Sequence, residues 1–223
     1  MNKSNKLNSL IILIIFVSFY GCSREGYLSS SYSTAITLLT NQYLDDKSLI
    51  DRELIESIPF ASSIISFENK QQSLIILESF KGQENQWISA DKIRFLEKKG
   101  RITRTIGLPN DLYSIERPDV DFNFLLNQDK YTYYAYYSFR KPDFNNLKVK
   151  INTEVIGKKK INILGVSRDV ILIRERLFSK KINWSALNEY WIDPVSKFVW
   201  KSKQSISPKL PYLEIEITKK PRN

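Results

Sequence analysis

The feature that most constrains the fold of this chain is an alternation of apolar and polar residues, which begins near Phe60 and continues over most of the sequence. In Leu213–Thr218 the three apolar residues alternate with Glu214, Glu216 and a threonine. Successive side chains of a β-strand point to opposite faces, so this period of two indicates strands with one buried face. Tyr131–Phe139 has aromatic or apolar residues at every odd position, so Tyr134 is among the side chains expected to be more exposed.

This pattern predicts about twelve strands joined mostly by short polar turns. The predicted strands cover residues 62–67, 73–80, 86–89, 93–97, 101–106, 131–139, 147–155, 159–166, 170–178, 189–193, 198–206 and 213–218. Few helical segments remain to serve as parallel crossovers, so the sheet should be antiparallel. Ser73–Leu77 is apolar on both faces, which requires cover on both sides.

One longer helix is predicted before the strands, over Tyr32–Leu44, where apolar residues fall at helical spacing and Ser31 or Ser33 can cap the start. A short second helical turn is predicted over Asp51–Glu56, just before Pro59. The predicted fold class is therefore mainly β: a curved antiparallel sheet or open barrel-like shell of about a dozen strands, with an N-terminal helix packed against it.

The N-terminus has the pattern of a lipoprotein signal peptide. Two lysines precede an apolar run, Leu10–Tyr20, which ends in Gly21–Cys22. Eleven helical residues rise only about 16 Å, against about 30 Å of bilayer core, so the run suits a cleaved secretory signal. Gly21–Cys22 resembles the end of a lipobox, although Phe19 and Tyr20 depart from its usual pattern. The alternative is an ordinary signal peptide followed by an unmodified thiol.

We therefore expect residues 1–21 to be a lipoprotein signal peptide, residues 22–31 a lipidated tether, and residues 32–223 a single β-rich periplasmic domain. Cys22 is the only cysteine of the chain, so it cannot form an internal disulfide, and lipidation explains its position. Because Ser23 rather than an acidic residue follows it, resemblance to other bacterial lipoproteins implies sorting to the outer membrane. A diacylglycerol group together with an amide-linked acyl chain, both on Cys22, should anchor the protein stably.

The positive charge of the chain is concentrated in one region. The chain has a formal net charge of +10, and residues 140–181 alone contain twelve Lys and Arg against four Asp and Glu. Export makes nucleic acid an unlikely partner, whereas an acidic polysaccharide or an anionic membrane surface would suit this charge. The alternative is that lysines such as Lys158–Lys160 are solvated turns or guards of edge strands against aggregation.

The composition argues against an enzyme. The chain has no histidine, which removes the commonest general base and zinc ligand, and it has no glycine-rich phosphate loop. The carboxylate pairs Asp119/Asp121 and Glu214/Glu216 are best explained as a loop and a solvent-facing strand. We therefore predict no catalytic residues, no cofactor and no metal site.

The aromatic residues offer a second kind of candidate site. Four tryptophans (Trp87, Trp184, Trp191 and Trp200) and the tyrosine-rich strand could stack on sugar rings. The alternative is that most of these rings fill the core, because aromatic residues favour strands and bury well.

Three blocks of sequence carry a resemblance to a known family. The blocks are Ile58–Ile64; Trp87–Asp91 with Gly100–Leu112; and Asn188–Asp193 with Val199–Gln204, Pro208 and Ile215–Pro221. In this order and spacing they resemble the group 4 capsule polysaccharide lipoproteins (the GfcB/YjbF/YmcC family). The resemblance covers most of the chain after the signal peptide, but it offers no motif for residues 118–182, where the basic residues are concentrated.

The resemblance implies a β-rich periplasmic lipoprotein that acts in capsule or exopolysaccharide export or assembly, without supplying a catalytic mechanism. The residues it nominates for a shared ligand or partner surface are Trp87, Arg101, Arg104, Asp111, Trp191 and Gln204. The alternative is that Gly107–Pro109 is only a turn and the tryptophans are core.

Two other functions remain open from the sequence. A curved sheet closed by a helix can enclose an apolar cavity, so a lipid or lipoprotein carrier is the main rival to a non-enzymatic polysaccharide accessory protein. A glycan-modifying enzyme that uses only carboxylates, drawn from Asp111, Asp119, Asp121, Asp193 and Glu189, is a third possibility. The expected partners are the membrane, through Cys22, and an acidic polysaccharide or the export machinery.

Overall fold

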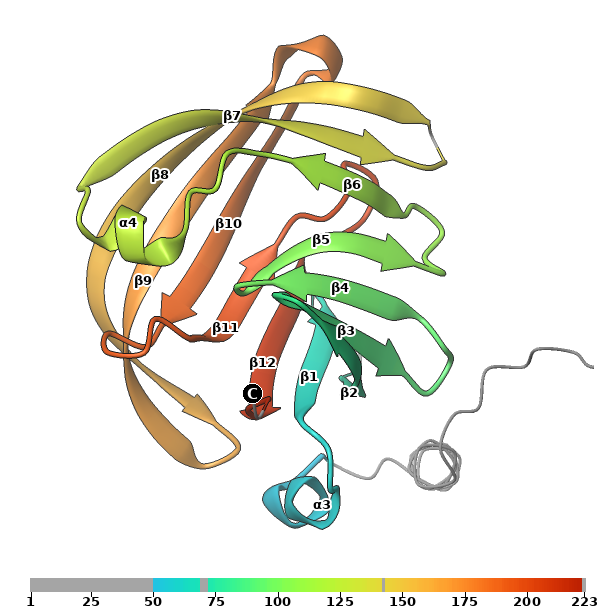
Figure 1. The fold of residues 1–223 in the computed structure, drawn as a ribbon, viewed down its shortest axis with the longest axis vertical. Coiled ribbons are helices and arrows are strands. Elements are labelled where there is room, and N and C mark those ends of the chain that lie inside the picture. Colours follow the sequence, from blue (N-terminus) through green and yellow to red (C-terminus); the bar gives the residue numbers. More distant parts are fainter. Residues whose placement is uncertain (1–49, 69–71, 142, 222–223) are drawn as a thin grey trace, which may run out of the picture. The chain divides into compact units, whose positions relative to one another are not determined.

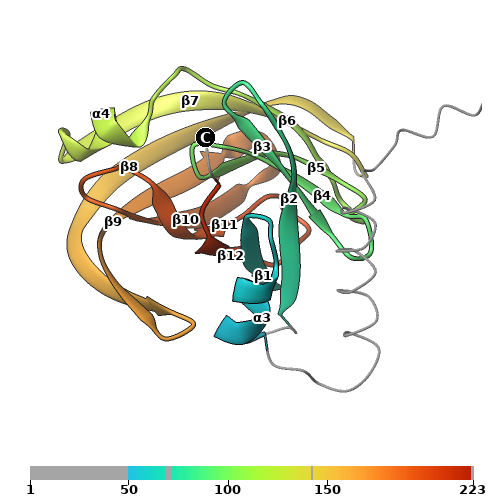
Figure 2. The same ribbon diagram turned by 60° about the horizontal axis from the view of Figure 1, so that its bottom comes forward.

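The computed structural model describes residues 50–68, 72–141 and 143–221, all of which belong to one compact unit of the chain. This part of the chain is a single twelve-stranded antiparallel sheet that curls into a nearly closed barrel (Figures 1 and 2). The strands are β1 (Ser62–Phe67), β2 (Ser73–Lys81), β3 (Glu84–Ser89), β4 (Arg94–Lys98), β5 (Arg101–Ile106), β6 (Leu112–Glu116), β7 (Lys130–Phe139), β8 (Phe144–Ile163), β9 (Val166–Ser179), β10 (Trp184–Ile192), β11 (Val199–Gln204) and β12 (Leu213–Lys219).

The helices are short: α3 (Arg52–Ser57), α4 (Phe122–Leu126) and the 3₁₀ turn η1 (Lys180–Ile182). Asp51 caps α3 by accepting a hydrogen bond from the Leu54 backbone N–H, which confirms the helical turn predicted there. The longer helix predicted over residues 32–44 lies outside the described residues. No helix in the described ranges is long and apolar enough to cross a membrane.

The strand order is β5-β4-β3-β2-β1-β12-β11-β10-β9-β8-β7-β6, so β5 and β6 are the two edges of the sheet. These edges lie side by side in Figure 1 because only a short turn separates them in the sequence. The Leu112 backbone N–H donates to the Thr105 hydroxyl across this seam. Curling therefore brings the two edges together and leaves little exposed edge.

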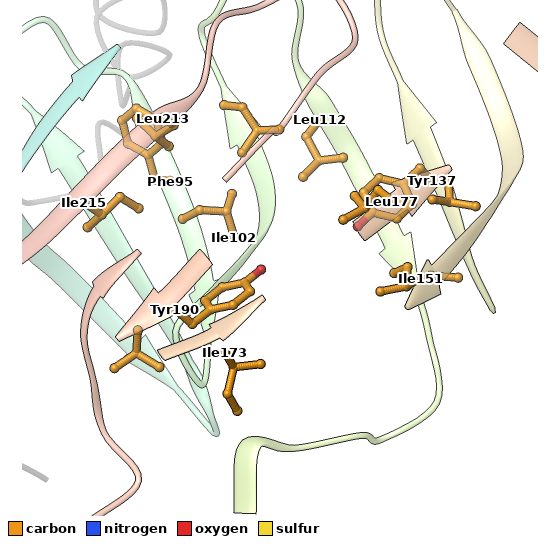
Figure 3. Close-up of a cluster of buried hydrophobic side chains, with 14 of the residues drawn as sticks. Phe95, Ile102, Leu112, Tyr137, Ile151, Ile173, Leu177, Tyr190, Leu213 and Ile215 are labelled. Atoms are coloured by element: carbon orange, nitrogen blue, oxygen red, sulfur yellow. The ribbon is translucent and has the colours of Figure 1, made fainter. Parts of the chain in front are cut away.

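The interior of the barrel is filled by one side of every strand. On β12, Leu213, Ile215 and Ile217 are buried inside, whereas Glu214 and Glu216 face outward and pair with lysines of β11. Figure 3 shows this cluster, in which Phe95, Leu112 and Tyr190 approach from different strands. The alternation seen in the sequence thus becomes an inside and an outside, and the predicted mainly β fold is confirmed.

Three details of the strand prediction are wrong. Residues 147–155 and 159–166 were expected to be separate strands, but β8 runs through both because Gly157 forms a bulge with φ of 119° rather than a turn. The strand β6 and the helix α4 were not predicted. β6 lies in a largely polar stretch with one proline, Asn110–Asp121, where no regular period is visible, and α4 follows it as a helix of only five residues.

Candidate functional site

A cleft opens at one end of the barrel, with a volume of about 420 Å³. We call it the mouth cleft. It is formed where several turns meet: those between β2 and β3, β4 and β5, and β10 and β11, together with α4 and the end of β12. Figures 1 and 2 both place α4 and the β10–β11 connection at the same end of the sheet. The lining residues used below are Phe80, Asn85, Trp87, Glu97, Lys99, Phe122, Lys197, Phe198 and Lys220.

The floor of the mouth cleft contains a buried carboxyl group. Glu97 is only 8% exposed, and its Oε2 accepts hydrogen bonds from Asn85 Nδ2 (2.6 Å) and Trp87 Nε1 (3.4 Å). Burial raises the pKa of Glu97 above its usual range, although these donors act in the opposite direction. Within the described chain, Asn85 Oδ1 is buried and has no hydrogen-bond partner. The floor therefore offers a carboxyl group and an unsatisfied acceptor beside an indole ring.

The rim of the mouth cleft is basic and aromatic. Lys220 Nζ lies 4.6 Å from the centre of the Phe198 ring, and Phe198 packs edge-on against Trp200. Lys197 Nζ donates to the Pro194 carbonyl oxygen at 2.6 Å. Lys99 makes two long ion pairs across the cleft's edge, with Asp119 and Asp121 at 3.7 and 3.6 Å. Apart from those two acids, cations dominate the rim.

Below the cleft, the interior of the barrel holds a buried ion pair. Arg101 donates to Glu175 Oε1 from Nη2 (2.7 Å) and Nε (3.2 Å), and both side chains are about 3% exposed. Tyr133 donates its hydroxyl hydrogen to the same oxygen, and Arg101 Nη1 donates to the Val120 carbonyl. The guanidinium group also lies 3.7 Å above the Phe122 ring. Burial would lower the pKa of Arg101, but the Glu175 carboxylate raises it above its usual value.

Gly100 connects this interior to the floor of the cleft. Its backbone N–H donates to the Glu97 carboxyl, and its carbonyl accepts from Gln204 Nε2 at 3.1 Å. Gln204 Oε1 in turn accepts from the Ile102 backbone N–H at 3.0 Å. Gly100 has a φ of 82°, and a Cβ at this position would overlap the Val199 side chain. Only glycine fits here, so the β4–β5 turn is held tightly against β11.

Asp111 lies at the seam between β5 and β6, where it organises a turn. Its carboxylate accepts hydrogen bonds from the Thr105 hydroxyl (2.9 Å) and from the backbone N–H groups of Leu108 (3.0 Å) and Gly107 (3.1 Å). Arg104 points outward nearby, with its guanidinium group 5.1 Å from the centre of the Tyr113 ring. These residues lie where the two edges of the sheet meet, and none of them lines the mouth cleft.

The outer surface of β7, β8 and β9 carries a second cluster, which we call the tyrosine–lysine face. It consists of Tyr134, Tyr136, Lys148, Lys150, Arg176 and Phe178. Tyr134 and Tyr136 are 48% and 42% exposed, as the period of the sequence indicates, and Phe178 is 44% exposed. The register places Lys150 between Tyr134 and Phe178, and Lys148 Nζ lies 4.3 Å from the centre of the Tyr134 ring.

The six residues nominated from the sequence do not converge on one site. Trp87 lies in the floor of the cleft, and Arg101 and Gln204 lie just beneath it in the interior. Arg104 and Asp111 lie at the seam. Trp191 is half-buried on the outer side, with Lys201 Nζ 5.6 Å from the centre of its ring. Cys22 lies outside the described residues.

Sequence reasoning missed the residues that complete these sites. Glu175, Asn85 and Glu97 read as ordinary polar positions on strands, and only the three-dimensional pairing puts them inside. One available signal was the run of three charged residues on β9. Because Arg174 and Arg176 face outward, the alternation of a strand turns Glu175 between them toward the inside. The four tryptophans divide evenly, because Trp87 and Trp184 are buried in the core and Trp191 and Trp200 are half-buried near cations.

The fold and the cleft together define a barrel-like β protein with a filled, ion-paired interior and an open mouth. Comparison with known proteins identifies the family: the chain belongs to the group 4 capsule polysaccharide lipoproteins. The family model described as "Group 4 capsule polysaccharide lipoprotein gfcB, YjbF" matches residues 33–218.

Two relatives support this assignment. The uncharacterized lipoprotein GfcB of Escherichia coli (strain K12) is 22% identical over 200 residues, which cover 88% of this chain and 91% of the relative. The crystal structure of the hypothetical lipoprotein YmcC from Escherichia coli K12 superimposes with a TM-score of 0.75 at 17% identity. That match covers 89% of this chain and all of the other, and it shows a shared fold.

Proposed function

We propose that this protein is a non-enzymatic, lipid-anchored accessory protein in the export or assembly of a capsule or exopolysaccharide. It contacts the acidic polymer through the tyrosine–lysine face. Family membership supports the connection to capsule polysaccharide. The observation that carries the polymer contact is the grouping of three exposed rings and three cations on one outer surface of the sheet.

The chemistry of the tyrosine–lysine face suits an extended acidic glycan. Aromatic rings offer flat apolar surfaces to sugar rings, and lysine and arginine attract carboxylates along the chain. Lys148 and Lys150 lie on β8, two strands in from the β6 edge and paired with a strand on each side, so protection of an edge strand does not explain them. Glu116 pairs with Tyr136 at the β6 margin and marks the boundary of the basic surface.

The anchor and location follow from the N-terminal sequence. In the proposal, cleavage after Gly21 leaves Cys22 as the lipidated first residue, and Ser23 directs the protein to the outer membrane with its domain in the periplasm. A protein held at that surface meets the polymer as it is exported.

The lipid-carrier alternative receives less support from the interior. Large side chains such as Phe95, Phe139 and Tyr190 are fully buried there. The space beside Arg101 and Tyr190 amounts to about 10 Å³, which is no more than one water needs. An acyl chain would have to displace this packed core.

The proposal is tested by measuring cell-surface and secreted high-molecular-weight polysaccharide in a deletion strain. The strain is complemented with wild type, with Cys22→Ala, or with a face variant combining Tyr134→Ser, Lys148→Glu and Lys150→Glu. A matched control carries Lys158→Glu and Lys159→Glu, the same charge change at the far end of β8.

Wild type and the Lys158/Lys159 control should restore the polymer, and the face variant and Cys22→Ala should not. Unchanged polymer in the deletion strain would remove the export role. Full restoration by the face variant, at normal protein level, would remove the polymer contact.

A further inference from the structure

The mouth cleft has the dimensions of a small-molecule site. Its volume of about 420 Å³ falls within the range of roughly 300–1,000 Å³ that ligand pockets occupy. It is closed below by Trp87, Ile215 and Ile217, which are buried core residues. A cleft that ends blindly in this way accepts a chain end or a side branch, whereas a polymer running past would need a groove open at both ends.

The polar groups in the floor of the cleft suit a ligand with hydroxyl groups. Asn85 Oδ1 is a buried acceptor that lacks a partner among the described residues, and leaving such an atom unsatisfied costs about 1–3 kcal/mol. A ligand hydroxyl can donate to it. The carboxyl group of Glu97 lies beside it and can exchange hydrogen bonds with a second hydroxyl. This arrangement does not suit an acyl chain, which would leave Asn85 Oδ1 buried without a partner.

The basic and aromatic residues of the rim suit a ligand in which an anionic group is attached to a flat ring. Phe80 is 51% exposed at one side of the cleft, and Phe198 lies at another with Lys220 over its face. Among the described residues, neither Lys197 nor Lys220 forms an ion pair with a carboxylate, whereas Lys99 is partly neutralised by Asp119 and Asp121. A carboxylate on a ligand could therefore approach two of the rim lysines, while its ring lies against an aromatic side chain.

We infer that the mouth cleft binds a terminal or side-branch acidic sugar, with its hydroxyl groups toward Asn85 and Glu97 and its carboxylate toward Lys197 and Lys220. The choice of a sugar as ligand rests on the proposed function, whereas the cleft's preference for a hydroxylated anion rests on its own residues. The tyrosine–lysine face and the cleft then contact different parts of one polymer.

Binding is measured on the mature lipidated protein in a detergent without sugar groups, by isothermal titration calorimetry. The probes are a methyl glucuronide, the matching neutral methyl glucoside, and inorganic phosphate. The glucuronide should bind about tenfold more tightly than the glucoside, the effect expected of one charge-assisted hydrogen bond. Phosphate should bind more weakly than the glucuronide because it lacks a ring.

Variants then place the site. Lys220→Gln and Asn85→Leu should each weaken glucuronide binding about tenfold. Lys220 is exposed, so its variant tests the site even where Asn85→Leu disturbs folding. Lys158→Gln, which removes a cation far along β8, should leave binding unchanged. Equal binding of glucuronide and glucoside, or of glucuronide and phosphate, would overturn the inference, as would an unaltered affinity in Lys220→Gln.

The two proposals fail separately. If the deletion strain loses its polymer but the purified protein does not bind the glucuronide, the cleft inference is wrong and the export function stands. Specific binding of the glucuronide alongside unchanged polymer would support the cleft and remove the function.

Discussion

The barrel interior and the mouth cleft both bury charged groups, but they treat them differently. Inside, Arg101 and Glu175 share two hydrogen bonds, and Tyr133, Val120 and Phe122 complete their surroundings. In the cleft, Glu97 has donors on both oxygens, yet its neighbour Asn85 keeps a buried oxygen without a partner in the described structure.

This difference separates a structural network from a candidate binding site. A buried polar network whose members are all satisfied rigidifies a core, and it leaves nothing for a ligand to complete. A cleft floor that retains an unsatisfied hydrogen-bond acceptor beside open space can still pair with a donor group of a ligand. Arg101 and Gln204, which the sequence nominated for a ligand surface, lie beneath the cleft and are hydrogen-bonded to other residues there.

The largest expected effect comes from breaking the interior ion pair. Arg101→Met should lower the free energy of unfolding by about 3–5 kcal/mol, because it leaves the Glu175 carboxylate buried without its cation. The loss is measured by urea denaturation followed by tryptophan fluorescence. The double variant Arg101→Met/Glu175→Met should recover much of it, since no unpaired charge then remains. An unchanged midpoint in the single variant would mean that the pair is not structural.

A smaller effect is expected at the connection between the two regions. Gly100→Ala places a methyl group against Val199, which should cost about 1–3 kcal/mol of overpacking in addition to the strain of a positive φ. Gly82→Ala is the matched control, because Gly82 also has a positive φ, of 62°, but no atom within 4 Å of the added Cβ. Urea midpoints should order wild type above Gly82→Ala and Gly82→Ala above Gly100→Ala. Equal losses in the two variants would show that the contact with Val199 has no energetic weight.

The seam tests whether the interior depends on closure of the barrel. Asp111→Ala removes three hydrogen bonds from the turn between β5 and β6, and it should cost about 1–3 kcal/mol. Hydrogen exchange should rise across residues 101–116, including the strand that carries Arg101. Asp193→Ala removes a similar turn cap between β10 and β11 and should affect only that loop. If the rise in hydrogen exchange in the Asp111 variant were confined to residues 107–111, the core would not depend on closure of the seam.

Much of the fold was predictable because the barrel has one inside and one outside. Many residues therefore alternate between buried and exposed positions with a period of two, as most of β7 and β12 show. Gly157 misled the prediction, because a glycine in a bulge and a glycine in a turn look the same in sequence. The strand β6 was missed because its only fully buried residue, Leu112, comes at its start, and the rest of its burial pattern is mixed.

The candidate site was less predictable, because it depends on which turns meet. Six residues between 80 and 99, together with residues 196–198 and 220, line one cleft only after the sheet curls and brings distant hairpins to the same end. The resemblance found Trp87, Arg101 and Gln204, which lie in or beneath that cleft. It could not distinguish them from Asp111 and Trp191, whose positions at the seam and on the outer face depend on strand register.

The smallest expected effect is a pH dependence that only the cleft should show. Because burial raises the pKa of Glu97, the folded state holds its proton more tightly than the unfolded state does. This contribution to stability is fully present below the usual pKa of 4.5 and is lost as pH rises through the folded-state value. Glu97→Gln should therefore gain stability relative to wild type between pH 4.5 and 8, measured as urea midpoints. The double variant Arg101→Met/Glu175→Met, which leaves no unpaired carboxyl group in the interior, is the comparison. Its difference from wild type should stay flat over the same range, because the pKa of Arg101 is raised above its usual value and the group does not titrate there. If the urea midpoints of Glu97→Gln and wild type changed with pH in parallel, the cleft carboxyl group would add no more pH dependence to stability than the interior pair does.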